Sequence, residues 1–122
     1  FINANAPATV AAGDATLTAA QLLTSIIIGS PGTSAAAYTL PTVANLEAAL
    51  PSIVKVGAAI DFTIINANGS SSGVITVTTN TGWTIGSAGI QGLMTIAATA
   101  GTSQRYRARK TGTGTWTLYR VA

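Results

Sequence analysis

Apolar and polar side chains alternate along most of the chain after residue 58, which predicts short strands with one buried face. A period of two residues places successive side chains on opposite faces of a strand. Runs of small residues, in which glycine and asparagine accept the backbone angles of tight turns, separate the alternating segments. Together with two extended segments in the first half, this pattern predicts strands at 25–29, 35–40, 60–65, 74–79, 83–86, 90–98, 104–110 and 116–122.

Two short helices are predicted in the first half of the chain. The sequence TAAQ (18–21) has the Thr-x-x-Gln spacing of a capping box, in which side chains satisfy free backbone donors at a helix start, and it predicts a helix at about 19–24. A second helix is predicted to begin after Thr42, its N-cap, and to end at Pro51, because proline disfavours helical geometry in the residue before it. The apolar positions of this second helix form one stripe and are Val43, Leu46 and Leu50.

The spacing of these elements predicts a single, mostly β domain. About seven or eight short strands, with a turn signal about every eight to twelve residues, are typical of an antiparallel β-sandwich. We expect a jelly-roll-like arrangement with one or two short helices near the N-terminal half. The predicted domain covers residues 16–122, since a chain of 122 residues is one domain by length.

Residues 1–15, FINANAPATVAAGDA, have no periodicity. One interpretation is a floppy terminus, which is common at chain ends. The other, which we adopt as the expectation, is an extended N-terminal arm that lies on a partner. Its apolar anchors are then Phe1, Ile2 and Val10.

The composition favours a protein that packs permanently against neighbours. Hydrophobic residues make up 48% of the chain and charged residues only 7%, against a typical charged share of about 25%. The remaining polarity comes mostly from threonine, serine, asparagine and glycine. A surface with so little charge repels other proteins weakly, so we expect a homo-oligomer.

Missing residue types argue against catalysis. The chain has no histidine and no cysteine, which excludes a Ser-His-Asp arrangement and a zinc–cysteine site. Its only acids are Asp14, Glu47 and Asp61, and nothing in their spacing marks a pair for glycoside hydrolysis or a metal site. The glycine-rich segments lack the spacing of a phosphate loop. We therefore expect no enzymatic activity, no cofactor and no metal.

The segment QRYRARK (104–110) is the main concentration of charge, in a chain of net charge +3. Alternation places Tyr106 and Ala108 toward the core and three arginines on the opposite face. We call these three the arginine row, which consists of Arg105, Arg107 and Arg109. At about 3.3 Å per residue the row is about 13–14 Å long, and Arg120 extends it if the strand register allows.

Three interpretations of the arginine row remain open. It is a solvated strand face that blocks edge-to-edge aggregation, a docking face for an acidic protein surface, or a phosphate-binding track. Single-strand binders place exposed aromatic rings among their cations, and Tyr106 points away from the row. We therefore expect protein or water at this face before nucleic acid. We expect no membrane partner, since no apolar run approaches the roughly 20 residues of a membrane span.

Several motifs resemble those of a known family. They are TLTAAQLL (16–23), TLPT with LEAALP (39–51), FTIIN (62–66) and the closing basic strand with TGTGTWTLYR (111–120). Over about residues 14–122 the chain resembles small structural domains of tailed bacteriophages, which occur as head decoration (cement) proteins and as modules of virion fibres. These motifs consist of hydrophobic framework and turns, so they specify the fold better than the role.

The resemblance implies a non-enzymatic virion protein at the capsid surface, a homotrimer that bridges subunits of the major capsid protein. The arginine row with Arg120, and the arm anchors, are the expected contacts with the capsid or with a sister subunit. The alternative is a tail-fibre or head-fibre module that binds a host receptor or glycan. Its candidate stacking residues are Trp83, Trp116 and Tyr119.

Overall fold

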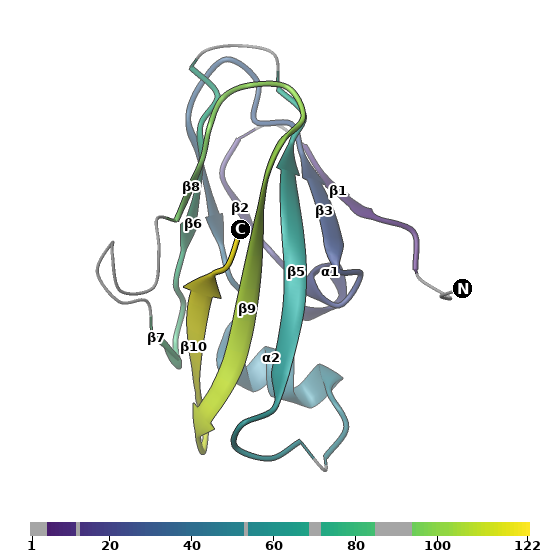
Figure 1. Cartoon of the computed structure of the whole chain (residues 1–122), viewed down its shortest axis with the longest axis vertical. Coiled ribbons are helices and arrows are strands. Elements are labelled where there is room, and N and C mark those ends of the chain that lie inside the picture. Colours follow the sequence, from purple (N-terminus) through teal and green to yellow (C-terminus); the bar gives the residue numbers. More distant parts are fainter. Residues whose placement is uncertain (1–4, 12, 53, 69–71, 85–93) are drawn as a thin grey trace.

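The computed structural model describes residues 5–11, 13–52, 54–68, 72–84 and 94–122. Ten strands and two helices lie within this part of the chain (Figure 1). In chain order they are β1 (Ala8–Val10), β2 (Ala15–Thr16), α1 (Ala19–Leu22), β3 (Ile26–Gly29), β4 (Ala36–Thr39), α2 (Val43–Ala49), β5 (Ala59–Asn66), β6 (Ile75–Thr78), β7 (Trp83–Thr84), β8 (Thr95–Ile96), β9 (Thr102–Gly112) and β10 (Thr115–Arg120).

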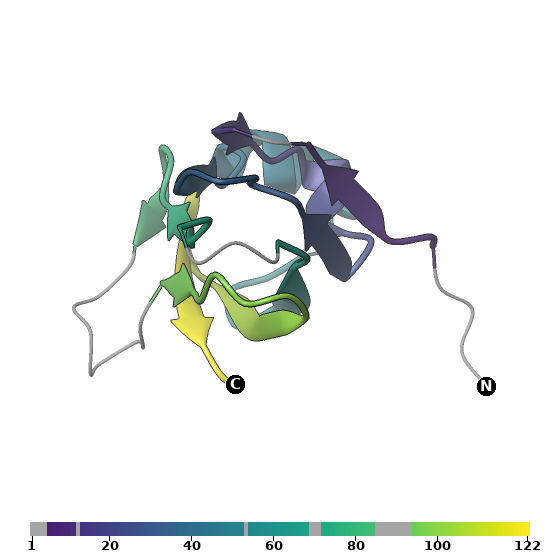
Figure 2. The same cartoon turned by 90° about the horizontal axis from the view of Figure 1, so that it is seen from above.

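Two sheets enclose one hydrophobic core. The larger sheet has the strand order β1-β3-β5-β9-β10-β7, and the smaller has the order β2-β4-β6-β8. Seen from above, the strands surround the interior, and both helices lie on the side away from β9 (Figure 2). The core includes a stacked pair, Phe62 and Tyr106, with ring centroids 5.5 Å apart.

The first six strands form what we call the parallel coils, in which each coil is one strand of the larger sheet followed by one strand of the smaller sheet: β1–β2, β3–β4 and β5–β6. The chain alternates between the sheets from β1 to β6, and neighbouring strands within each sheet run parallel. A parallel pair needs a long crossover connection, which here consists of a strand in the other sheet and, after β2 and β4, a short helix. Each coil therefore adds one strand to each sheet.

The two helices begin in the same way, at equivalent positions of successive coils. Thr16 of β2 pairs with Thr39 of β4, and a leucine follows each threonine in the sequence. Thr18 then caps α1 with the complete capping box, and Thr42 caps α2. Both helix predictions are confirmed. The shared motif, TLT at 16–18 and TLPT at 39–42, makes equivalent turns from sheet to helix.

The last part of the chain pairs differently, and we call β9 with β10 the closing hairpin. β9 runs antiparallel to both β5 and β10, and β8 runs antiparallel to β6. The predicted β-rich fold is confirmed, but exclusively antiparallel pairing was wrong: among the described residues, five of the eight strand pairs are parallel. Alternation of apolar and polar side chains indicates that a strand is half-buried, but it does not indicate whether the neighbouring strand runs parallel or antiparallel. The jelly-roll-like arrangement is not confirmed.

The segment predicted as an arm contributes to both sheets. Ala8–Val10 pairs with β3 at the edge of the larger sheet, and Ala15 pairs with Tyr38 in the smaller sheet. Val10 is only 8% exposed and belongs to the core. It therefore anchors the chain's own fold, whereas Phe1 and Ile2 lie outside the described residues.

Most of the remaining strand predictions match observed strands to within one or two residues. The predicted strands at 83–86 and 90–98 are the exceptions, because parts of both lie outside the described residues. Within the described part of the chain, neither helix has the length and apolar character required to cross a membrane.

Candidate interaction surface on the six-stranded sheet

The arginine row lies on the outer face of β9, as the alternation predicts. Its three arginines are exposed, while Tyr106 and Ala108 between them are completely buried. Figure 1 views β5, β9 and β10 from outside, with α2 behind them. No described element lies over this face of the sheet (Figure 2).

Strand register decides which side chains accompany the row. Across β5, the three arginines face Thr63, Asp61 and Ala59 in turn. Across β10, Arg107 lies opposite Tyr119, and the Val121 backbone N–H donates to the Arg105 carbonyl at 2.8 Å. Cross-strand partners share a face of the sheet, so Tyr119 and Val121 flank the row.

Arg120 does not extend the arginine row. It lies opposite Tyr106 in the β9–β10 ladder and therefore sits on the side of the sheet that faces away from the row. Burial raises the pKa of the Tyr106 phenol to about 12, and the nearby charge of Arg120 partly opposes this rise. The register condition for Arg120 to extend the row is therefore not met, because the register of two strands cannot be read from one strand's alternation.

Asp61 is the acid that contacts the row. Its carboxylate accepts two hydrogen bonds from Arg107, from Nε at 2.7 Å and from Nη2 at 2.9 Å, which is the bidentate geometry of strong guanidinium–carboxylate pairs. Arg105 approaches the same carboxylate at 3.8 Å. The hydrogen bonds from Arg107 and the two positive charges hold the pKa of Asp61 below its usual value. Among the described residues, no acid forms an ion pair with Arg109.

An apolar patch adjoins the row on β3 and β5, and we call it the isoleucine patch. It consists of Ile26, Ile28 and Ile65. Ile26 pairs with Thr63, which pairs in turn with Arg105, and Ile28 pairs with Ile65, so all lie on the outer face. Ile26 is 40% exposed. This patch was not predicted from the sequence, although the run SIIIG (25–29) and the doublet Ile64-Ile65 are apolar in both strand phases.

Glu47 and Lys110 form a different kind of ion pair. The Lys110 Nζ donates to Glu47 Oε1 at 2.9 Å, and the Trp116 Nε1 donates to the same oxygen at 3.0 Å. These hydrogen bonds lower the pKa of the Glu47 carboxyl. The cluster joins α2 to the closing hairpin, so its role is structural.

The third acid also holds the fold, since Asp14 Oδ1 accepts the backbone N–H of Ala37 at 2.8 Å. Within the described residues, no group of three or more histidines, cysteines or acids gathers in one place.

The candidate stacking residues of the alternative function lie mostly in the core. Trp116 is completely buried and Trp83 is 8% exposed, and Trp83 Nε1 donates to the Pro41 carbonyl at 2.6 Å. Only Tyr119 is partly exposed. The two tryptophans are therefore framework residues with rings 6.2 Å apart.

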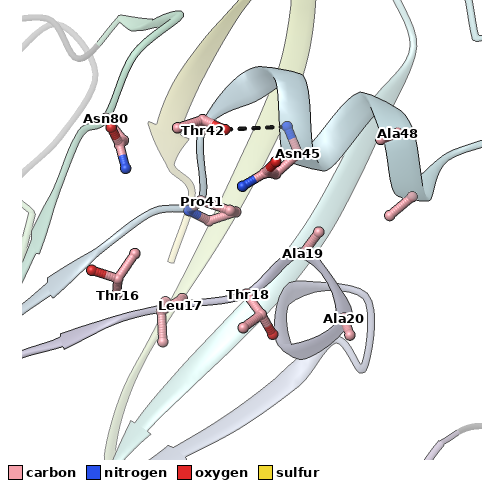
Figure 3. A pocket seen from close by; sticks show the side chains of 11 residues that line it. Thr16, Leu17, Thr18, Ala19, Ala20, Pro41, Thr42, Asn45, Ala48 and Asn80 are labelled. Carbon is pink, nitrogen blue, oxygen red and sulfur yellow. Dashed lines mark hydrogen bonds between the residues drawn. The ribbon is translucent and has the colours of Figure 1, made fainter.

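A groove of about 550 Å³ crosses the helix starts of successive coils (Figure 3). Its lining side chains are neutral hydroxyls, amides and small apolar groups: Thr16, Leu17, Thr18, Ala19, Ala20, Pro41, Thr42, Asn45, Ala48, Ala49 and Asn80. This groove was not predicted from the sequence. Its signal is the repeated TLT and TLPT motif, which brings equivalent turns side by side.

Comparison with known proteins leaves the geometry as the basis for function. No protein-family model, no curated protein and no solved structure matches the chain. The resemblance to phage decoration proteins therefore stays a prediction.

Proposed function

We propose that the protein is a non-enzymatic structural protein of a phage virion, which decorates the capsid surface and bridges neighbouring subunits of the major capsid protein. The observation that carries this proposal is the outer face of the six-stranded sheet, which no described element covers (Figure 2) and where the arginine row adjoins the isoleucine patch. An apolar centre with polar surroundings is typical of protein interfaces. The structural use of all three acids also supports a role without catalysis.

The proposed mechanism is thermodynamic linkage. A protein that binds the assembled shell, and not its separated subunits, shifts the equilibrium toward the shell. A homotrimer strengthens this effect, because linked weak contacts bind with higher avidity than one contact alone. Phe1 and Ile2 are proposed to add contacts with the capsid or a sister subunit.

The direct test is to mix the purified protein with intact virions and with emptied shells of its phage, and to image both by cryo-electron microscopy. We expect added density at junctions between capsid subunits, and a trimer mass by light scattering. Density at a fibre, or no added density, contradicts capsid decoration. A variant that lacks residues 1–6, which precede β1, tests the arm: unchanged occupancy excludes a contribution from Phe1 and Ile2.

A second candidate function is a fibre module that binds a host receptor or glycan. The groove in Figure 3 favours it, because its volume lies in the range of small-ligand sites and its polar lining consists of neutral hydroxyls and amides. The test is NMR titration with neutral oligosaccharides. Shifts at Asn45 and Asn80 that disappear in Asn45→Ala support this function, and no shift at the groove removes it.

A further inference from the structure

The outer face of the six-stranded sheet combines two kinds of chemistry at fixed positions. The isoleucine patch lies on β3 and β5, and the arginine row lies on β9, the next strand of the sheet. Thr63 pairs with both Ile26 and Arg105, so the apolar and basic groups meet at this residue. Neighbouring strands are about 4.8 Å apart, so one partner surface can contact both groups.

The charge of this face selects its partner. The row contributes three positive charges and Asp61 contributes one negative charge, which leaves the face positive. A second copy of the same face would bring like charges together, which is costly in an interface. The acid on that second face is also already engaged by its own Arg107.

A phosphate backbone also fits this face poorly. Asp61 lies in the middle of the row, opposite Arg107, where its carboxylate repels phosphate. The isoleucine patch gives no contact that a phosphate track can use, and single-strand binders rely on exposed rings near their cations. Tyr106 within the row is completely buried, which leaves the partly exposed Tyr119 as the ring that flanks the described part of the row.

The three arginines differ in what they can offer a partner. Asp61 holds Arg107 through two short hydrogen bonds, so most of this guanidinium's capacity is used inside the chain. Arg105 reaches the same acid only at 3.8 Å, and Arg109 forms no ion pair with the described acids. Arg105 and Arg109, about 13 Å apart along the strand, therefore keep their donors for a partner.

We infer that this face binds a protein surface that presents carboxylates beside apolar side chains, with Arg105 and Arg109 as the contacting arginines, whereas Arg107 is engaged by Asp61 within the chain. The inference rests on the proposed function only for the statement that the partner belongs to a capsid. The chemistry of the partner follows from the face itself.

The test uses three defined probes with fluorescent labels, measured by anisotropy: an amphipathic peptide of glutamate and leucine, its glutamine–leucine analogue, and oligothymidylate. We expect the glutamate–leucine peptide to bind most tightly. Arg109→Gln and Arg105→Gln are each expected to weaken its binding by up to about fivefold, and Ile26→Ser is expected to weaken it by about threefold or more.

Matched controls lie on the loop before β5. Lys55→Gln removes the same charge, and Val56→Ser removes an apolar side chain that is 58% exposed; both leave peptide binding unchanged if the inference holds. An equal loss in Lys55→Gln, equally tight binding of oligothymidylate, or no binding of the glutamate–leucine peptide overturns the inference.

The same variants separate this inference from the proposed function. If Arg109→Gln weakens peptide binding as expected but the wild-type protein does not decorate shells, the capsid role fails and the inference holds. If shells are decorated equally by wild type, Arg109→Gln and Ile26→Ser, the capsid role holds and the inference fails.

Discussion

The parallel coils and the closing hairpin divide the chemistry of this protein unequally. Five of the six cations lie in residues 102–122, whereas all three acids lie in residues 1–101. Two of those acids bind the hairpin, Asp61 from β5 and Glu47 from α2. The coils thus carry a small negative net charge from three acids and one lysine, and the hairpin carries most of the positive charge.

The two ion pairs that join these regions differ in their surroundings. The Lys110–Glu47 pair is mostly covered, with side-chain exposures of 14% and 29%, whereas Arg107 and Asp61 are 50% and 37% exposed. Solvent screens an exposed pair strongly, so its contribution to stability is small. The Lys110–Glu47 pair therefore contributes mainly to folding, and the Arg107–Asp61 pair contributes mainly to the arrangement of the surface.

The largest expected loss of stability follows from truncating a buried side chain of the hairpin. Trp116→Ala deletes a completely buried ring and leaves a cavity, and such a change costs about 3–5 kcal/mol. Urea unfolding followed by circular dichroism measures this loss. Val56→Ala at an exposed position serves as the control, and a similar midpoint for both variants contradicts the assignment of Trp116 to the core.

Glu47→Gln tests the covered connection between α2 and the hairpin. Losing the carboxylate removes a charge-assisted hydrogen bond to Lys110, and we expect a loss of about 1–2 kcal/mol at neutral pH. The pKa of Glu47 is lower in the folded state, so its contribution is complete above the ordinary value of 4.5 and disappears as the pH falls through the lowered value.

The stability difference between wild type and Glu47→Gln should therefore narrow on acidification below pH 4.5. Thermal melts of both proteins over a series of acidic buffers measure this trend. A difference that stays constant throughout the acidic range shows that the carboxylate's charge does not stabilise the fold.

Thr42→Ala tests the coils without touching the hairpin. The Thr42 side chain accepts the Asn45 backbone N–H at 3.2 Å, and loss of such a cap costs about 1 kcal/mol. Thr18→Ala at the equivalent helix start should cost a similar amount. Chemical denaturation compares the free energies of unfolding of the two variants. A negligible loss at both positions contradicts the idea that these caps stabilise the turns from sheet to helix.

Asp61→Asn gives the smallest change in stability, below about 1 kcal/mol, because its ion pair is exposed. Its effect on binding should have the opposite direction. Removing the one acid of the face raises its positive charge, so the glutamate–leucine peptide should bind about two- to fivefold more tightly. Weaker peptide binding in Asp61→Asn instead shows that the orientation of Arg107 matters more than the net charge.

Local features of the fold could be predicted from the sequence. The alternation of Arg105, Tyr106, Arg107 and Ala108 depends only on the period of one strand, and the caps at Thr18 and Thr42 depend on residues at most three positions apart. These predictions are confirmed. The exposed arginine row therefore follows from the residue order of a single strand.

Features that depend on pairing between distant segments could not be predicted. The side chain of Arg120 belongs to the inner face because of its register with Tyr106, and Val10 is buried because β1 joins β3. The parallel direction of β3 and β5 follows from where the chain crosses between sheets, and alternation within one strand contains no information on that path.

The number of coils determines how many strands each of the two sheets contains, and therefore how wide the sheets are. Because each coil adds one strand to each sheet, an inserted coil between β2 and β3 would widen both sheets together. The pairing of β5 with β9 would remain the same, so the basic face would keep its geometry. Whole-coil insertions would therefore change the span of the two sheets without changing the strand pairing that presents the arginine row.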